Sequence, residues 1–408
     1  MKLVIAEKPS VAMALASVLG ARTRKDGYVE GNGYIVSWCV GHLVGLCDAS
    51  EYDEKYKKWR YDDLPIVPEC WKHKVLEGTK KQFGILKKLM RDSKVDEVIC
   101  ATDAGREGEL IFRLVYEQAG CKKPMKRLWI SSMEEQAIKD GFASLKDGSC
   151  YDSLYQSALC RAKADWLVGI NASRLFSVLY NQNLKVGRVQ TPTLAMIVDR
   201  NQKIKEFTKE KYYDMDAVTE NFQKKEDADK VAAECQERMC EVEKDDVKEK
   251  TVRPPKLYDL TTLQREANRM FGYTAQQTLD AVQEMYEQKL VTYPRTDSQY
   301  LTDEMGESTE TLIQMLFGKM PYAEGLEYQP DVSKVLNSKK VSDHHAIIPT
   351  MEVAKADIGE LKERSRKILY LISARVLTAT ADPYIYESHK CQITCNYHTF
   401  YLNAKKTK

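Results

Sequence analysis

The chain has 408 residues, of which 43% are hydrophobic and 30% charged, and its mean hydropathy is −0.49. This composition excludes collagen-like, intrinsically disordered and membrane-embedded proteins, and at roughly 100 to 200 residues per domain the length predicts several domains. The 62 Lys and Arg nearly balance the 60 Asp and Glu, so the net charge of +2 neither requires nor excludes a polyanionic partner.

The N-terminus and the cysteines indicate a cytoplasmic protein. Glu7 and Lys8 interrupt what would have to be the apolar stretch of a signal peptide, and no apolar run approaches the roughly 18 residues of a membrane span. The 11 cysteines are scattered and include no Cys-x-x-Cys pair, which fits a reducing cytosol and argues against a zinc ribbon. We therefore expect no export and no membrane partner.

The first 150 residues alternate between strand and helix patterns, which predicts an α/β domain. The predicted strands cover residues 3–6 and 97–102, and the predicted helices cover 9–19 and 107–119. Pro9 in the first turn and Gly20 beyond the end are typical of a helix at 9–19. Because open α/β sheets bind ligands at the carboxyl ends of their strands, we expect the site at these strand-to-helix turns.

From residue 151 to about 205 the apolar spacing is helical. The side chains predicted to line its buried side are Leu167, Ile170, Ala172, Leu175 and Leu179. The following stretch, to about residue 251, has mixed charge, with an alternating pattern over 212–218 that predicts exposed strands beside a charged helix. Pro254 and Pro255 then mark a boundary before two predicted helices, at 261–269 and 274–288.

Glu7 and Lys8 directly follow the first predicted strand. A carboxylate beside an ammonium group at a strand end can donate a proton and hold a phosphate. The alternative is a solvated charge pair at the start of a helix, and the pair alone does not decide between the two.

Asp103 and Glu107 lie four residues apart on the second strand-to-helix turn, in the segment ATDAGREGEL, so their carboxylates can converge. Oxygen ligands of this kind suit Mg²⁺. The alternative is that acidic residues in a first helical turn complement the helix dipole. Gly105 and Gly108 weaken that alternative, because glycine at a helix start usually marks a close backbone approach.

Tyr293 lies in the segment LVTYPRTDS. Any one of the 23 tyrosines is far more often a packing residue than a nucleophile. Here Pro294 fixes the local backbone, and Arg295 supplies a planar guanidinium that can hold a phosphate oxygen. A phenol with a pKa of about 10 needs such help to attack phosphorus.

Together these segments closely resemble the type IA DNA topoisomerases, with spacing typical of the topoisomerase III branch. The resemblance extends along essentially the whole chain through seven landmarks in family order: AEKPS, WCVGHL, ATDAGREGELI, RVQTPT, DLTTLQ, TYPRTDS and HHAIIPT. Seven ordered landmarks make chance similarity an inadequate explanation.

The resemblance implies that one DNA strand is broken and rejoined by transesterification, without ATP. Tyr293 matches the nucleophile that becomes joined to a 5′ phosphate, and Glu7 matches the acid that protonates the leaving 3′ oxygen. Lys8 and Arg295 match the cations that stabilise the transition state. His344 matches the histidine that contacts the scissile region.

The resemblance also implies Mg²⁺ at the acidic turn of a TOPRIM domain, held by Asp103 and Glu107. The commonest family pattern has a third acidic residue where this chain has Gly105, which should weaken metal binding, although Mg²⁺ often uses only one or two carboxylates. Glu7 and Glu109 are candidate additional ligands, and for Glu109 we favour an ordinary place on the helix surface.

A groove for single-stranded DNA is the third implication, since basic and amide side chains can follow a sugar-phosphate backbone with little reading of bases. The residues that match this groove are Arg161, Asp165, Arg174, Arg188, Gln190, Thr191 and, in the second helical region, Gln264.

The implied fold is multidomain α/β plus α, forming part of a toroidal type IA architecture. Its segments are a Rossmann-like TOPRIM domain (1–150), the first part of a helical DNA-binding domain (151–207), the first part of a β-rich arch (208–255), a mixed helical catalytic-tyrosine domain (256–380) and the start of a return strand into the arch (381–408). Because chains of the family continue beyond this return, we expect the chain to be C-terminally incomplete.

The main hypothesis is therefore a monomeric topoisomerase that acts on DNA at the bacterial nucleoid, with relaxation or decatenation left open as its natural role. The alternative is a fragment that binds single-stranded DNA and cleaves it without complete strand passage. A primase or nuclease that shares only the TOPRIM domain ranks last, because it leaves TYPRTDS and HHAIIPT unexplained.

Overall fold

The computed structural model describes residues 1–131, 133–209, 222–325, 329–341 and 344–407. The chain divides into two compact units. The first unit contains Met1–Leu194, Lys256–Leu326 and Val332–Leu377, and the second contains Ala195–Pro255, Glu327–Asp331 and Thr378–Lys408. Every residue predicted for catalysis, metal binding or DNA binding belongs to the first unit.

The first unit contains a seven-stranded sheet in the order β2-β3-β4-β1-β7-β8-β9. Its strands are β1 (Lys2–Ala6), β2 (Thr23–Lys25), β3 (Tyr28–Gly31), β4 (Tyr34–Trp38), β7 (Glu97–Ala101), β8 (Met125–Arg127) and β9 (Lys146–Asp147). The neighbours β4, β1, β7 and β8 are parallel. The predicted Rossmann-like α/β fold is confirmed, and the carboxyl ends of β4, β1 and β7 meet at one edge.

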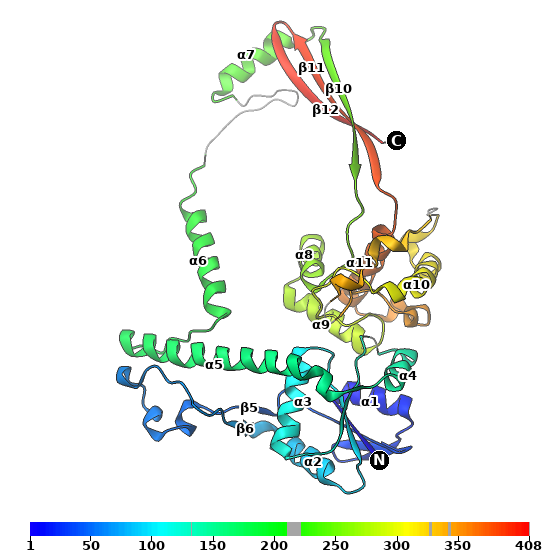
Figure 1. Ribbon diagram of the computed structural model, residues 1–408. Helices are drawn as coiled ribbons and strands as arrows, with labels where there is room; N and C mark the ends of the chain where they lie inside the picture. The colour runs from blue at the N-terminus through cyan, green and yellow to red at the C-terminus, as the bar shows by residue number, and fades with distance from the viewer. Residues whose placement is uncertain (132, 210–221, 326–328, 342–343, 408) are drawn as a thin grey trace. The chain divides into compact units, whose positions relative to one another are not determined.

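Helices cover this sheet and bury its central strands. They are α1 (Pro9–Leu19), α2 (Lys80–Arg91), α3 (Arg106–Ala119) and α4 (Glu135–Ala143), beside a small hairpin of β5 (Val44–Leu46) and β6 (His73–Val75). Figure 1 labels α1, α2 and α3 in the same part of the chain as the sheet. Helix α1 has the predicted ends, and Gly20 ends it with a φ of 76°, in the left-handed region that favours glycine. Leu3 and Ile5 of β1 are fully buried, as expected for parallel strands covered on both faces, and Phe112 of α3 is buried in the same core.

Helix α5 (Asp152–Tyr180) packs on α3 through its first half only, by way of Tyr155, Ala158 and Leu159. The buried side predicted for its second half is wrong. Leu167, Ile170, Ala172 and Leu175 are only half-buried, and Leu179 is 58% exposed. The reason is that loops, rather than an apolar helix face, cover this half, so polar contacts such as Asn171 to the backbone of Ile66 replace apolar packing. Helix α6 (Gln190–Lys205) follows.

The tyrosine-bearing part of the first unit is helical. It contains α8 (Leu260–Phe271), α9 (Ala275–Glu287) and α10 (Gly306–Lys319), and α11 (Glu363–Ala379) closes it. The two helices predicted around 261–288 are confirmed, and a capping box of Thr274 and Gln277 starts α9. Single 3₁₀ turns lie at Ala49–Glu51, Glu54–Lys57, Tyr61–Asp63, Glu77–Thr79, Gly148–Tyr151, Asp303–Met305, Pro321–Ala323, Val332–Val335, Ser338–Lys340, Met351–Ala354 and Ile358–Glu360.

The second unit contains α7 (Lys225–Cys235) and an antiparallel sheet of β10 (Glu241–Val252), β11 (Tyr384–Cys395) and β12 (His398–Thr407). The single return strand predicted from Tyr384 onward is wrong, because the chain reverses at Asn396 and Tyr397. Both residues have positive φ, at 46° and 70°, as a two-residue hairpin turn requires. The alternating pattern predicted over 212–218 lies outside the described residues.

No helix in the described part of the chain is both long and apolar enough to cross a bilayer. The segment boundaries predicted from the sequence, and the toroidal arrangement, stay predictions.

Candidate active site

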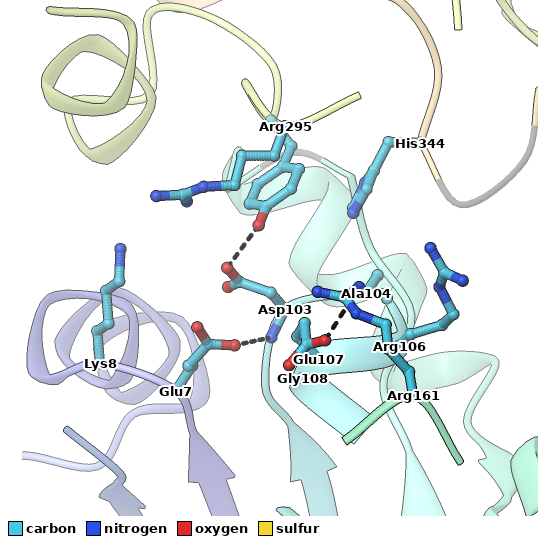
Figure 2. A pocket seen from close by; sticks show the side chains of 12 residues that line it. Glu7, Lys8, Asp103, Ala104, Arg106, Glu107, Gly108, Arg161, Arg295 and His344 are labelled. Carbon is cyan, nitrogen blue, oxygen red and sulfur yellow. Dashed lines mark hydrogen bonds and ion pairs between the residues drawn. The ribbon is translucent and has the colours of Figure 1, made fainter. Parts of the chain in front are cut away.

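Two parallel strands deliver the acidic residues of the site. The register pairs Ala6 of β1 with Ala101 of β7, so the residues that follow these strands emerge side by side. The backbone N–H of Asp103 donates a hydrogen bond to Glu7 Oε2 at 3.3 Å. Figure 2 shows both carboxylates at this edge, beside Lys8 at the start of α1.

The tyrosine and the histidine come from two segments that lie alongside each other. Thr292 N donates to Ile348 O at 3.0 Å, and Thr296 Oγ1 donates to His344 O at 2.8 Å. These bonds place the rings of Tyr293 and His344 with centroids 4.2 Å apart. The TYPRTDS and HHAIIPT segments therefore form one structural feature.

The Tyr293 hydroxyl donates a hydrogen bond to Asp103 Oδ2 at 2.8 Å. Its backbone N–H donates to Ser131 O at 3.3 Å, and its ring packs edge-on against Tyr286 with centroids 5.4 Å apart. Contacts on three sides leave Tyr293 only 8% exposed and point its hydroxyl at the strand ends.

These groups surround a pocket of about 320 Å³. It is lined by every residue predicted for catalysis or metal binding, namely Tyr293, Glu7, Lys8, Arg295, His344, Asp103 and Glu107. Arg161, predicted to bind DNA, also lines the pocket. So does Arg106, which we did not single out although it lies within the acidic segment. Because most of the side chains that line the pocket are charged, the pocket suits a charged substrate group.

Burial shifts the pKa values of Glu7 and Tyr293. It raises the pKa of Glu7 to about 7, helped by the negative charge of Asp103 and opposed by Lys8 and Arg295. Glu7 can therefore take up a proton near neutral pH. Burial, followed by the charge of Asp103, raises the pKa of Tyr293 well above its ordinary value, so the phenol stays protonated in the free protein.

Two of the four Lys and Arg side chains that line the pocket contact the C-terminal end of α9. Lys8 Nζ lies 3.8 Å from Glu287 Oε1, and Arg295 Nη1 donates to Gln283 Oε1 at 3.1 Å. Gln283 and Glu287 are four residues apart and so share one face of the helix. Neither anchor was identified from the sequence, because nothing in the α9 pattern marks them.

His344 is 5% exposed, and burial lowers its pKa to about 4, so its ring is neutral at pH 7. Its Nδ1 lies 3.3 Å from the Ser131 hydroxyl. Ser131 thus contacts the histidine through its side chain and the tyrosine backbone through its carbonyl. The sequence carries no signal for this role, because serines are common at strand ends.

Gly108 is required by the acidic turn, whereas the backbone conformation of Gly105 does not itself require glycine. A Cβ on Gly108 would lie 2.1 Å from Asp103 O, closer than any side chain tolerates. The close backbone approach that we inferred therefore exists at Gly108. Gly105 has extended backbone with a φ of 175°, which any residue adopts.

The expectation that Glu109 lies on the helix surface is wrong. It is 1% exposed, with Oε1 2.8 Å from Arg113 Nε and Oε2 3.1 Å from Arg127 Nε. Arg127 is also buried, and it donates to the carbonyls of Thr102 and Asp103 at 2.7 Å each. A buried ion pair thus supports the backbone of the acidic turn, and Glu109 faces away from the pocket that Glu107 lines.

The carboxylates Asp103 and Glu107 fit Mg²⁺ bound with water and a substrate phosphate. Glu107 lies 3.5 Å from His42 Nε2 and 3.3 Å from Arg161 Nη1, and the contact with His42 lowers its pKa, so it is ionised. Among the described residues, no three His, Cys, Asp or Glu side chains group closely enough to hold a metal alone. Mg²⁺ commonly uses one or two carboxylates and completes its shell with water and phosphate.

The residues predicted to bind DNA fall into two sets. In the first set, Asp165 lies between two arginines. Its Oδ2 is 4.0 Å from Arg161 Nε and 3.3 Å from Arg188 Nη2. All three side chains are more than 40% exposed. Gln190 and Thr191 follow at the start of α6.

Arg174 and Gln264 lie apart from that set. Arg174 is 6% exposed, with its guanidinium carbon 5.3 Å from the centre of the Trp59 ring. Gln264 donates to the carbonyl of Ala275 at 2.9 Å and so joins α8 to α9.

A Rossmann-like sheet that meets a tyrosine-bearing helical part at its strand ends defines a class of protein, and comparisons with known families agree. Residues 2–133 match the Toprim domain, and residues 149–408 match the DNA topoisomerase family. The chain belongs to the type IA DNA topoisomerase family.

Several relatives are similar over nearly the whole chain. It is 43% identical to the DNA topoisomerase 3 of Bacillus thuringiensis (strain Al Hakam), over 98% of this chain and 58% of that protein. It is 44% identical to the DNA topoisomerase 3 of Shouchella clausii, over 97% of this chain and 57% of that protein. The chain thus spans less than three-fifths of the length of these relatives.

A solved structure is also similar. Full-length topoisomerase I from Thermotoga maritima superposes with a TM-score of 0.72 and 25% identity, over 100% of this chain and 66% of that one.

Proposed function

We propose that the chain cleaves and rejoins one DNA strand through a 5′-phosphotyrosine intermediate at Tyr293, without ATP. The observation that carries the proposal is the hydrogen bond from the Tyr293 hydroxyl to Asp103, within the pocket that Glu7, Lys8 and Arg295 also line. A nucleophile, an acid and two cations around one pocket are what transesterification of a phosphodiester requires.

In the cleavage step the phenol oxygen attacks phosphorus, and the bond from phosphorus to the 3′ oxygen breaks. Because the pKa of Tyr293 is raised, its proton must leave during the attack rather than before it. Asp103 Oδ2 already accepts the hydrogen bond from the hydroxyl and is in place to take this proton.

Glu7 serves the leaving group. With a pKa of about 7, both its protonated and its ionised forms are populated at neutral pH. The acid donates a proton to the departing 3′ oxygen, and the resulting carboxylate takes it back when the strand is rejoined. A positioned acid of this kind contributes roughly 10²- to 10⁴-fold in rate.

Lys8, Arg295 and His344 act on the phosphate. The two cations offset the negative charge that grows on the phosphate oxygens, and α9 holds both of them through Glu287 and Gln283. His344 is neutral at pH 7 and can donate one hydrogen bond to the phosphate without adding charge.

Mg²⁺ belongs to the proposal as a cofactor held by Asp103 and Glu107, with Glu7 as a further donor when ionised. A bound Mg²⁺ would supply positive charge beside the phosphates and support rejoining and strand passage. Arg161, with Nη1 3.3 Å from Glu107 Oε1, also faces this carboxylate with a positive charge.

Single-stranded DNA is the proposed partner, and the exposed set of Arg161, Asp165, Arg188, Gln190 and Thr191 is its proposed path to Tyr293. Arg188 and Arg161 can bind DNA phosphates when their ion pairs with Asp165 are replaced by ion pairs with the phosphates. A monomer working in the bacterial cytoplasm, the toroidal architecture and the segment boundaries set out from the sequence complete the proposal. The relatives named above come from bacteria.

A covalent-adduct assay tests the nucleophile. An oligonucleotide labelled at its 3′ end should leave label on the denatured protein, whereas a 5′ label should be released, because the tyrosine retains the 5′ phosphate. Tyr293→Phe should abolish the adduct. Tyr286→Phe, a neighbouring buried tyrosine, is the matched control and should retain it. An undiminished adduct in Tyr293→Phe would sink the assignment.

Plasmid relaxation measured beside cleavage separates the two functional candidates. Because the chain spans only 57 to 59% of the length of its relatives, cleavage without complete strand passage is the second candidate. Adducts together with relaxed plasmid support the full activity, and adducts without relaxation support the second candidate. EDTA should slow rejoining more than cleavage; equal loss of both steps would contradict the role given to Mg²⁺.

A further inference from the structure

Three cysteines of the second unit meet at one end of its sheet. Cys235 ends α7, Cys240 immediately precedes β10, and Cys395 ends β11. All three are free thiols. They play no part in the chemistry at Tyr293, and the sequence shows no Cys-x-x-Cys pattern that would have singled them out.

The strand register sets Cys240 opposite Cys395. Strands β10 and β11 are antiparallel, with Glu241 paired to Thr394, so the next pair outward is Cys240 and Cys395. Directly opposite residues of an antiparallel pair have Cα atoms about 4.5 to 5.5 Å apart and side chains on the same face. A disulfide needs Cα atoms about 4.4 to 6.8 Å apart, so this pair can close without backbone movement.

Cys395 Sγ lies 3.9 Å from the carbonyl oxygen of Met239, the residue directly before Cys240. An interaction with Cys395 is also the main cause that raises the pKa of Cys240 above its ordinary value. Cys235 is oriented differently, because its Sγ lies 3.5 Å from the carbonyl oxygen of Cys395, while Cys395 Sγ lies 3.8 Å from that of Cys235. Each of these two thiols faces the other's backbone, so Cys240 is the better partner for Cys395.

The two cysteines differ in their exposure to solvent, and this difference determines which of them can react first. Cys240 is exposed, whereas Cys395 is 1% exposed. A small disulfide in solution can therefore reach Cys240 but not Cys395. An accessible thiol beside a shielded one is the arrangement of an attacking cysteine and a resolving cysteine.

We propose that Cys240 and Cys395 form an oxidisable pair that closes into an intramolecular disulfide by exchange with a small-molecule disulfide such as oxidised glutathione. The Cys240 thiolate attacks one glutathione sulfur and releases the first glutathione thiol. The Cys395 thiolate then attacks Cys240 Sγ, breaks the mixed disulfide and releases the second. Two protein thiols are oxidised, one small disulfide is reduced, and the two protons end on the released thiols.

The disulfide would stabilise the sheet where the pairing of β10 with β11 is irregular. The β10–β11 register is irregular between Val242 and Lys244, next to Cys240. A cross-link there holds the start of β10 against the β11–β12 hairpin and limits fraying at this end. The inference concerns the second unit alone and holds whether or not Tyr293 cleaves DNA.

Peptide mapping of the full chain after incubation with oxidised glutathione, followed by alkylation, tests the pair. We expect linked peptides that contain Cys240 and Cys395, and slower amide exchange at the start of β10. Cys240→Ser should remove both effects and, as an exposed substitution, should leave the fold intact. Cys70→Ser, at another exposed cysteine, is the matched control and should change neither.

Three outcomes would overturn the inference: alkylation of both cysteines, stable glutathione on Cys240 without a link, or a link from Cys395 to Cys235. Because the raised pKa lowers the thiolate fraction of Cys240, the time course should extend over hours. The pH and the glutathione concentration should therefore be the same for every variant.

Discussion

Replacing Glu109 by glutamine tests whether the ion pair beneath the acidic turn holds this part of the molecule together. The side chain is 1% exposed and contacts Arg113 at 2.8 Å and Arg127 at 3.1 Å. Glutamine keeps the size of the side chain but removes its charge. Arg127, whose side chain is fully buried, would then carry a charge with no counter-ion.

Removing one partner of a buried ion pair lowers the free energy of unfolding by about 3 to 5 kcal/mol. Because glutamine can keep a hydrogen bond to one arginine, we expect Glu109→Gln to cost about 3 kcal/mol, the lower end of this range. That is a large share of a total stability of roughly 5 to 15 kcal/mol. Glu107→Gln is the matched control, two residues away on the same helix. Its side chain is 49% exposed, so it should cost about 0 to 1 kcal/mol.

Urea unfolding followed by circular dichroism measures both variants against the parent chain. Arg127 also donates to the carbonyls of Thr102 and Asp103, so we expect Glu109→Gln to lower cleavage in the adduct assay as well. If the free energies of unfolding of Glu109→Gln and Glu107→Gln differ by less than about 0.5 kcal/mol, the spread expected of ordinary surface substitutions, the buried ion pair does not stabilise this part of the molecule.

Three further predictions concern Glu7, Ser131 and Arg188. Carboxyl NMR without Mg²⁺ should give Glu7 a midpoint near 7, and Asp103→Asn should lower it by removing a like charge; a midpoint near 4.5 would contradict the burial argument. Because the folded-state pKa is raised, the contribution of Glu7 to stability is present below about 4.5 and lost as the pH rises through about 7. Ser131→Ala should cost about 1 kcal/mol and change the tautomer ratio of His344 in nitrogen NMR, whereas an unchanged ratio would show that the hydroxyl is not its partner. DNA affinity should fall steeply with salt, and Arg188→Gln should reduce the slope by about 1; a flat response would exclude phosphate contacts.

Local patterns were sufficient for many elements of the fold and for the chemical groups of the site. Pro9 and Gly20 delimit α1, and the strand patterns place Glu7 directly after β1 and Asp103 two residues beyond the end of β7. Each of these features depends on residues that are close in the chain, where backbone preference and side-chain period act directly. The same holds for Tyr293, because its neighbouring Pro and Arg are local.

Other features depended on which parts of the chain pack together. The contact of Tyr293 with Asp103 joins residues 190 positions apart. Glu109, on helix α3, looked like a surface residue because its partner Arg127 lies on strand β8. Helix α5 lost its expected apolar face because loops cover its second half. The sequence by itself therefore determined which groups are present and on which elements, while the tertiary structure decided which of them meet. The physical reason is that burial and charge pairing depend on distant neighbours, which no local pattern records.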